Sequence, residues 1–386
     1  MQTKIKVLEI IKGLDIGGTN GGAEQFAIQL AKSLDRNQYQ VMVCAFFKQG
    51  TATEAYWHKE LTSQGIEVFF VSEWHGNNRF DTYLRGMFAL KETLKENHVD
   101  VCHSHFQLGT ITAIYLKMLG VSKRAIRTVH ILQEWEKSWY GYVRRQVFTK
   151  WIFPACLDAE VGVSQALVNE LSQHPGTRLF KKKPILIYNA IPIRPFSLTH
   201  AKQERKTRIL GTVGRLEEQK GHRFLLGAIP EIIAEIQDVM FWFIGDGSLR
   251  QELETLARDL GISKHINFMG KRTDVADLVA QLDLFILPSL WEGFPTVIME
   301  SMASGIPVLA TRIPGTDELI EDGLTGWLVD PGSSEALANG IIQVLKNPEE
   351  WDGIKERALK GVSRFSIENI SAHYHSLFQK LLVGRG

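Results

Sequence analysis

The sequence has 386 residues, which is too long for one ordinary hydrophobic core and favours two domains. Its 44% hydrophobic and 23% charged residues are typical of a globular chain, and a formal net charge of +1 gives no electrostatic reason to expect nucleic acid as a partner. Cys44, Cys102 and Cys156 are isolated and lack metal-ligand spacing, so we expect a reducing compartment and no disulfide framework.

The N-terminal half alternates apolar runs with helical patterns. Lys6 to Ile11 is the first predicted strand, and since no apolar core with a cleavage site follows it, we do not expect a signal peptide. No stretch is long enough to span a bilayer, so the expected location is the cytoplasm. Later predicted strands are Gln40 to Phe46, Glu67 to Val71, Val99 to His103, Arg124 to His130 and Ala159 to Val163. This alternation predicts a parallel, doubly wound α/β sheet that binds ligands at the carboxyl ends of its strands.

A glycine-rich loop, Gly13 to Gly22, lies between the first strand and a helix predicted at Ala23 to Leu34. Its glycines would let the backbone approach a diphosphate closely. The loop lacks a clean G-x-G-x-x-G pattern and an acidic residue at the Rossmann spacing, which argues against a dinucleotide-dependent oxidoreductase.

Three histidines lie at or just beyond predicted strand ends, where side chains can point into a ligand cleft. These are His103, His105 and His130. A lone histidine is more often a structural residue, and the alternative is that His103 and His105 line the acceptor side of the cleft.

The segment 132–154 is rich in aromatic and basic residues, and a basic run, Lys181 to Lys183, follows it. Two interpretations are open. The segment is either an interfacial helix that touches lipid headgroups or a helix that covers the sheet and extends its cations into solvent.

Residues 189–208 have the composition of a linker, with prolines and a polar, charged run. We therefore predict a first domain over residues 1–195, a second over 196–365, and a final helix over 366–386.

The second half repeats the strand and helix alternation. Arg215 and Lys220 follow the strand at Arg208 to Val213, where two cations would neutralise a diphosphate leaving group without a metal; surface charges are the alternative. Gly245 and Lys271 follow the next two predicted strands.

The stretch Trp291 to Glu300 combines a tight loop with the start of a helix, and Pro295 stands in the first helical turn. Free N–H groups at such a helix start form an anion site. Glu292 in the loop and Glu300 about two turns into the helix flank that site. Because carboxylates repel phosphate, they are better suited to accept hydrogen bonds from hydroxyls. A nucleotide-sugar, with hydroxyls on both sides of its phosphates, fits this pattern.

Two glutamates separated by seven residues, with Gly293-Phe294-Pro295 after the first, resemble the E-x7-E motif of family 4 glycosyltransferases. The resemblance implies the GT-B fold, in which two Rossmann-like domains face a central cleft and a C-terminal helix crosses back to the first domain. The first domain would face the acceptor, and the second would bind the nucleotide-sugar.

The resemblance also implies roles for single residues. Glu300 would bind the ribose, Glu292 the sugar hydroxyls, and His130 the sugar near its reacting carbon, which makes His130 and Glu292 the catalytic candidates. The whole implied donor-binding set is Gly21, Gly22, Arg215, Lys220, Gly245, Lys271, Glu292, Gly293, Phe294, Pro295, Thr296 and Glu300.

The activity implied by the resemblance is that of a retaining hexosyltransferase in polysaccharide biosynthesis. Its donor would be a nucleotide-diphosphate sugar, with UDP as the expected nucleotide. Its acceptor would be a hydroxyl of a glycan or of a lipid-linked molecule. A lipid-linked acceptor would be consistent with peripheral contact with the cytoplasmic face of a membrane. No Asp-x-Asp sequence or metal-binding pattern is evident, so we expect neither a metal nor a cofactor. Two rivals remain: a nucleotide-sugar epimerase on the same fold, and a non-catalytic GT-B subunit that binds a partner.

Overall fold

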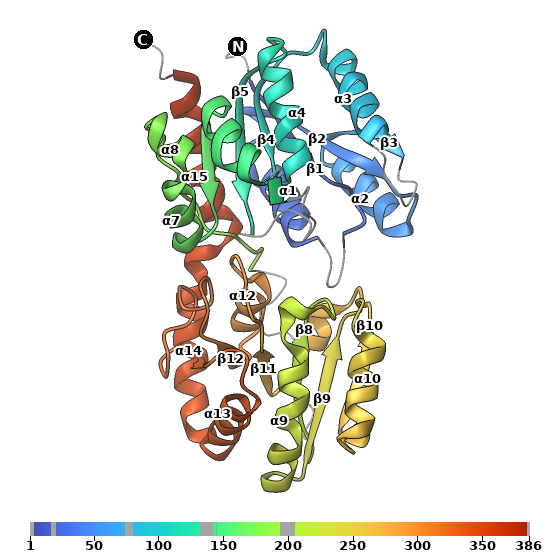
Figure 1. Cartoon of the computed structure of the whole chain (residues 1–386), viewed down its shortest axis with the longest axis vertical. Coiled ribbons are helices and arrows are strands. Elements are labelled where there is room, and N and C mark those ends of the chain that lie inside the picture. Colours follow the sequence, from blue (N-terminus) through green and yellow to red (C-terminus); the bar gives the residue numbers. More distant parts are fainter. Residues whose placement is uncertain are drawn as a thin grey trace. The chain divides into compact units, whose positions relative to one another are not determined.

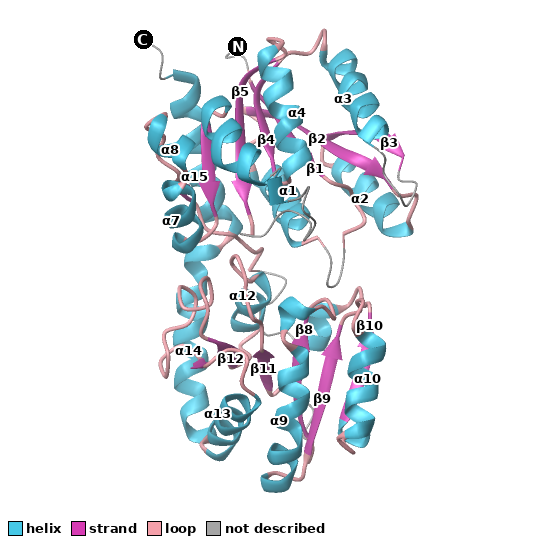
Figure 2. Ribbon diagram, in the orientation of Figure 1, coloured by secondary structure: helices cyan, strands magenta, loops and turns pink. Residues whose placement is uncertain are grey.

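A computed structural model describes residues 4–16, 21–73, 80–131, 142–143, 145–193 and 205–383 (Figure 1). The chain forms two compact units. Unit 1 runs to Asn189 and takes in the chain again from Ile367, while unit 2 comprises Ala190–Ser366. The boundary predicted after residue 195 falls among residues 194–204, which lie outside the described part. Each unit is a parallel sheet flanked by helices (Figure 2).

The sheet of unit 1 has the strand order β3-β2-β1-β4-β5-β6-β7, and its strand pairs are parallel. The strands are β1 (Ile5–Ile11), β2 (Tyr39–Lys48), β3 (Glu67–Glu73), β4 (Val99–Ser104), β5 (Ser122–Val129), β6 (Ala159–Gly162) and β7 (Ile185–Leu186). The central strands are buried along most of their length because helices cover both faces, which explains why they appear in the sequence as continuous apolar runs.

Helices follow most strands of unit 1, as the alternation predicts. They are α1 (Gly22–Ser33), α2 (Ala52–Ser63), α3 (Phe80–Leu94), α4 (Gln107–Met118), the π-helical η1 (Arg145–Ile152), α6 (Phe153–Cys156), α7 (Gln165–Gln173), α8 (Pro175–Leu179) and α15 (Ile367–Val383). Side-chain caps fix some of their starts: Thr51 accepts a hydrogen bond from the N–H of Glu54 at α2, and Ser164 does so from Leu167 at α7.

The last helix, α15, packs on α1 and β5, far from its neighbours in the sequence. Tyr39 OH lies 2.8 Å from His375 Nδ1, and Arg124 Nε donates a hydrogen bond to the Leu381 carbonyl at 2.7 Å. The predicted return of the C-terminal helix to the first domain is therefore confirmed.

The sheet of unit 2 has the order β10-β9-β8-β11-β12-β13, again with parallel pairs. Its strands are β8 (Arg208–Val213), β9 (Val239–Ile244), β10 (Ile266–Gly270), β11 (Leu284–Leu287), β12 (Val308–Thr311) and β13 (Trp327–Val329). Its helices are α9 (His222–Glu235), α10 (Arg250–Asp259), α11 (Val275–Val279), α12 (Thr296–Ala303), α13 (Ser334–Lys346) and α14 (Trp351–Val362), with short 3-10 turns η3 (Glu218–Lys220), η4 (Ser263–His265), η5 (Pro348–Glu350) and η6 (Ser363–Phe365). Because all strands run the same way, the loops that follow them meet at one edge.

No helix in the described ranges combines the length and apolar character that crossing a bilayer requires.

Candidate functional site

The loops at the carboxyl edge of the unit 2 sheet are tied to one another by backbone hydrogen bonds. Leu290 N, after β11, donates to Gln219 O, after β8, at 2.8 Å. Leu216 N donates to Asp246 O at 3.0 Å, and Leu249 N donates to Leu216 O at 2.9 Å, which joins the loops after β8 and β9. The edge is thus one connected rim on which side chains can be held in fixed positions.

Two glycines with positive φ allow this close approach. Gly221 has φ +61, and a Cβ there would lie 2.1 Å from the Pro288 carbonyl oxygen. Gly315 has φ +90, and its Cβ would lie 2.4 Å from the Gly293 oxygen. Only glycine fits at both places, so the loop between β11 and α12 is held from two sides.

Helix α12 begins at Thr296, and Pro295 occupies its N-cap without a side-chain hydrogen bond. The first N–H groups of the helix therefore keep the ability to bind an anion. Phe294 is buried and packs edge-on against Phe365 at 5.3 Å. Of the predicted residues, Gly293, Phe294 and Pro295 thus shape the backbone at the helix start, and the Phe294 ring is an anchor.

Glu292 is buried and holds three polar partners. Its Oε1 lies 2.5 Å from Lys220 Nζ and accepts a hydrogen bond from Ser289 Oγ at 2.7 Å, and its Oε2 accepts one from Gln219 Nε2 at 3.4 Å. Neither Ser289 nor Gln219 was identified as a site residue from the sequence. Ser289 could have been identified, because it follows directly after a buried apolar strand.

Glu300 is half-buried on α12, and no described residue forms an ion pair with it. Burial raises the pKa of its carboxyl to about 7, against a hydrogen bond from Thr296 that lowers it. A ligand hydroxyl that donates a hydrogen bond to this carboxylate would stabilise its ionised form.

The remaining predicted residues of unit 2 lie on the same rim. Arg215 follows β8 and is exposed, and no described acidic group forms an ion pair with it. Gly245 N donates to Gly270 O at 3.0 Å, which brings Gly245 and Lys271 to neighbouring strand ends.

In unit 1, Gly21 and Gly22 stand at the start of α1. Gly21 is the N-cap, with φ +79 and no side-chain cap, and a Cβ on Gly22 would meet no atom of the described residues within 4 Å. Among the described residues, no side chain therefore caps the start of α1 or crowds Gly22, as the close approach of a ligand requires. Residues 17–20 of the predicted glycine-rich loop lie outside the described part.

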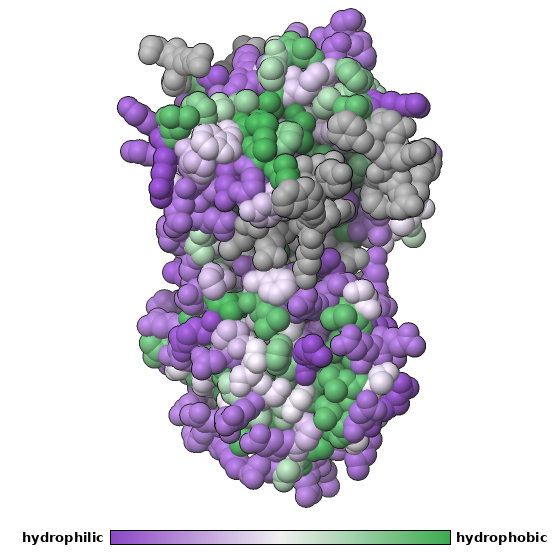
Figure 3. Space-filling view, viewed as in Figure 1, coloured by the Kyte–Doolittle hydropathy of each residue, from purple (hydrophilic) through white to green (hydrophobic). Residues whose placement is uncertain are grey.

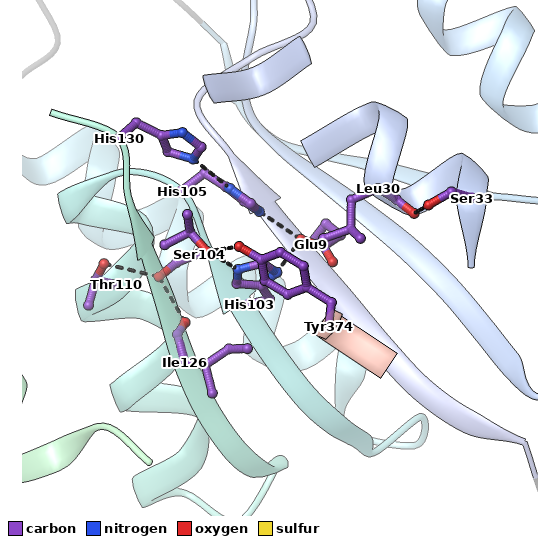
Figure 4. A network of polar contacts seen from close by, with 11 residues as sticks. Glu9, Leu30, Ser33, His103, Ser104, His105, Thr110, Ile126, His130 and Tyr374 are labelled. Atoms are coloured by element: carbon purple, nitrogen blue, oxygen red, sulfur yellow. Dashed lines mark hydrogen bonds and ion pairs between the residues drawn. The ribbon is translucent and has the colours of Figure 1, made fainter. Parts of the chain in front are cut away.

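His130 follows β5 and is half-buried, whereas the structure contradicts an acceptor-side position for His103 and His105. Both are buried in the interior of unit 1, where each lies within 3 Å of Glu9 Oε2. The three histidines and Glu9 form one polar network (Figure 4). Burial and the neighbouring His105 and His103 hold the pKa of His130 well below its usual value, against the opposing effect of Asn189, so its ring is neutral at pH 7.

Two family models match the chain. Residues 20–194 match the model described as Glycosyltransferase Family 4, and residues 197–361 match the model described as Glycosyl transferases group 1. The two matches divide the chain near the boundary between units 1 and 2.

The chain is also similar to individual glycosyltransferases. An uncharacterized glycosyltransferase of Haemophilus influenzae is 30% identical over 358 residues, which are 92% of this chain and 95% of the relative. The UDP-Gal:alpha-D-GlcNAc-diphosphoundecaprenol alpha-1,3-galactosyltransferase of Escherichia coli is 25% identical over 351 residues, 84% of each chain. The crystal structure of HepE from Anabaena in complex with UDP and glucose superposes with a TM-score of 0.78 at 22% identity, covering 97% of this chain and 100% of HepE.

Two Rossmann-like parallel sheets and a C-terminal helix that returns to unit 1 define the GT-B fold, as predicted. The match of both halves and the similarity to whole relatives then decide the family. The chain belongs to family 4 of the glycosyltransferases.

Proposed function

We propose that the protein is a retaining hexosyltransferase that moves a sugar from a UDP-sugar to a hydroxyl of a glycan or lipid-linked acceptor. The observation that carries this proposal is the placement of Glu292 and Glu300 around the uncapped start of α12, with Lys220 beside Glu292. The names of two similar proteins support the donor and acceptor classes: one acts with UDP-Gal on a diphosphoundecaprenol-linked sugar, and one was crystallised with UDP and glucose.

Each part of the donor meets a matching group in this proposal. Glu300 accepts hydrogen bonds from the ribose hydroxyls, and Glu292 accepts them from the sugar. The N–H groups at the start of α12, with Arg215 and Lys220, face the diphosphate. Gly245 and Lys271 lie where the nucleotide would continue along the rim. Two cations and a helix start balance the diphosphate charge, and on that basis we propose that no metal is required.

The proposed reaction breaks the bond between the sugar C1 and the diphosphate oxygen and forms a bond from C1 to the acceptor oxygen on the same face. The acceptor hydroxyl gives its proton to the departing phosphate oxygen, so no side chain acts as the nucleophile. Neutral His130 hydrogen-bonds a hydroxyl of the transferred sugar, and Gly21 and Gly22 leave space for the diphosphate at the start of α1.

A surface of unit 1 supports contact with a membrane that carries the acceptor. Helices η1 and α8 pack together, and they and the turn after α8 expose Trp151, Leu179 and Phe180 beside the basic run Lys181 to Lys183. Figure 3 shows apolar residues beside hydrophilic ones on the flank of unit 1 where α8 lies. Apolar side chains next to lysines suit an anionic lipid surface. Residues 132–141 and 144 of the predicted interfacial segment lie outside the described part.

Binding to lipid vesicles tests this surface. We expect the protein to sediment with vesicles of phosphatidylglycerol and less with phosphatidylcholine, and a Leu179→Ser/Phe180→Ser variant to lose this binding. Val383, an exposed apolar residue on α15, provides the control Val383→Ser, which should bind as the wild type does. Equal binding by both variants would contradict a membrane-facing role for the α8 surface.

A panel of nucleotide-sugars, each with and without lipid-linked and glycan acceptors, tests the transfer itself. We expect acceptor-dependent release of UDP in the presence of EDTA, and proton NMR of the product should show the anomeric configuration of the donor. Conversion of the donor to an epimer without acceptor would identify an epimerase. Absence of nucleotide binding would instead favour a non-catalytic subunit.

A further inference from the structure

A line of polar contacts crosses unit 1 from Glu9, in the middle of β1, to His130, at the end of β5 (Figure 4). Glu9 Oε2 lies 2.8 Å from His105 Nε2, and His105 Nδ1 lies 3.1 Å from His130 Nε2. Glu9 and His105 are buried, whereas His130 is half-buried. His105, which follows β4, thus connects a carboxylate in the core to the histidine that the proposed function places against the donor sugar.

The positions of the protons follow from the two ends of this line. Two imidazole nitrogens, His105 Nε2 and His103 Nδ1, converge on Glu9 Oε2, and a carboxylate in this position accepts hydrogen bonds. His105 must therefore donate through Nε2. A neutral imidazole has one N–H, so donation through Nε2 leaves His105 Nδ1 as an acceptor, and His130 donates to it through Nε2, which lies 3.1 Å away.

We propose that His105, oriented by Glu9, is a positioning residue for His130. It holds the His130 ring in place and in the tautomer that carries its proton on Nε2. The lone pair then resides on Nδ1, which is buried and has no hydrogen-bond partner among the described residues, and this is the nitrogen left to accept from a sugar hydroxyl in the proposed function. The sugar contact rests on the proposed function, whereas the tautomer does not.

The packing of Phe26 supports this role. Its ring, on α1, lies edge-on to His105 at 6.0 Å and to His130 at 5.5 Å. One buried aromatic side chain therefore restrains both imidazole planes, as a ring that must keep a fixed orientation requires. The same helix begins at Gly22, about one turn before Phe26.

A second branch of the network leads away from His130 and provides a control. His103 Nδ1 lies 2.9 Å from Glu9 Oε2, His103 Nε2 lies 2.8 Å from Thr128 Oγ1, and Thr128 Oγ1 lies 2.8 Å from Tyr374 OH. Tyr374→Phe removes a hydroxyl from the same buried network without touching the contact between His105 and His130. A general loss of buried hydrogen bonding would affect this variant as well.

A metal ion is the competing use of these groups. The ligand atoms of Glu9, His103 and His105 lie within 4.8 Å of one another. A metal on His105 Nε2 would leave the His105 proton on Nδ1, which would then donate to His130 Nε2. The proton of His130 would move to Nδ1. The tautomer of His130 therefore distinguishes the two arrangements.

Two substitutions of His105 separate its two contacts. In His105→Gln the amide reaches the place of Nε2 and can still donate to Glu9, but nothing replaces the Nδ1 acceptor. In His105→Asn the amide oxygen takes the place of Nδ1 and can accept from His130. The measurements are histidine side-chain nitrogen NMR, with the His130 signals assigned by their loss in His130→Ala, the kcat for sugar transfer, and the Kd for UDP.

We expect His130 to carry its proton on Nε2 in the wild type, in His105→Asn and in Tyr374→Phe, and to populate both tautomers in His105→Gln. The kcat of His105→Gln should fall about 10- to 100-fold while its Kd for UDP stays unchanged, and His105→Asn should recover most of the loss. An unchanged tautomer of His130 and an unchanged kcat in His105→Gln would overturn the proposal. A wild-type protein that binds one metal ion per chain and carries the His130 proton on Nδ1 would overturn it as well. If the wild type transfers no sugar, the proposed function fails, while the NMR result still decides the role of His105.

Discussion

Lys220 Nζ and Glu292 Oε1 lie 2.5 Å apart, although the two residues come from different loops at the edge of the unit 2 sheet. Both side chains are largely shielded from solvent. A shielded cation and a shielded anion depend on each other, because either one alone would bear an uncompensated cost of desolvation. The two groups predicted to meet the donor phosphate and the donor sugar are thus one electrostatic unit.

Removal of one partner should therefore cost both stability and activity. We expect Glu292→Gln to lower the free energy of unfolding by about 1–3 kcal/mol, because Lys220 loses its counter-charge. The double variant Lys220→Met/Glu292→Gln should recover most of that stability and still transfer sugar at least about 10-fold more slowly than the wild type. Denaturant unfolding and UDP release measure the two effects. If the double variant lost as much free energy of unfolding as the two single variants lose together, the pair would not be coupled.

Glu300 should make the stability of the protein depend on pH. Its pKa is about 7 in the folded protein against an ordinary value of 4.5, so the folded state keeps a proton that the unfolded state loses. Ionisation of Glu300 then lowers stability as the pH rises from about 4.5 to 7, and the loss persists at higher pH. Glu300→Gln should be more stable than the wild type at pH 8 by about 1–3 kcal/mol and equal to it at pH 4. A difference that does not change between these pH values in thermal unfolding would refute the assignment.

Arg215 should contribute to donor binding and not to folding, because it is exposed and forms no ion pair with any described acidic group. Arg215→Ala is expected to weaken UDP binding about 10- to 100-fold with an unchanged melting temperature. Arg223, also exposed in unit 2 and 3.7 Å from Glu252, is the matched control, and Arg223→Ala should bind UDP normally. Equal affinities of the two variants in isothermal titration would remove Arg215 from the proposed site.

Gly221 should tolerate no side chain, because its Cβ would lie 2.1 Å from the Pro288 oxygen. Gly323 has a similar φ of +73, but a Cβ on Gly323 would meet no described atom within 4 Å, so Gly323→Ala measures the backbone strain alone, about 1 kcal/mol. Gly221→Ala should lose at least about 2 kcal/mol more and bind UDP more weakly, since the loop that carries Glu292 must shift. Unfolding curves that coincide for the two variants would contradict the close approach of these loops.

The sequence was sufficient for the fold because buried parallel strands appear as apolar runs separated by helical patterns. The contacts inside the site were harder to predict. Glu9 and His105 are far apart in the sequence, and the order β1-β4 that brings them together is a property of the sheet. Spacing of two residues places His103 and His105 on one face, but only the packing of α1 and α15 decides that this face is buried. A glutamate inside the apolar strand β1 was the overlooked signal, because a buried carboxylate needs partners.

A crystal structure of the protein with bound UDP would locate the nucleotide relative to Glu300 and the start of α12. We expect the ribose hydroxyls on the Glu300 carboxylate and the diphosphate at the first N–H groups of α12, within hydrogen-bond distance of Arg215 or Lys220. UDP bound elsewhere, with Glu300 facing solvent and the start of α12 unoccupied at saturating nucleotide, would contradict it.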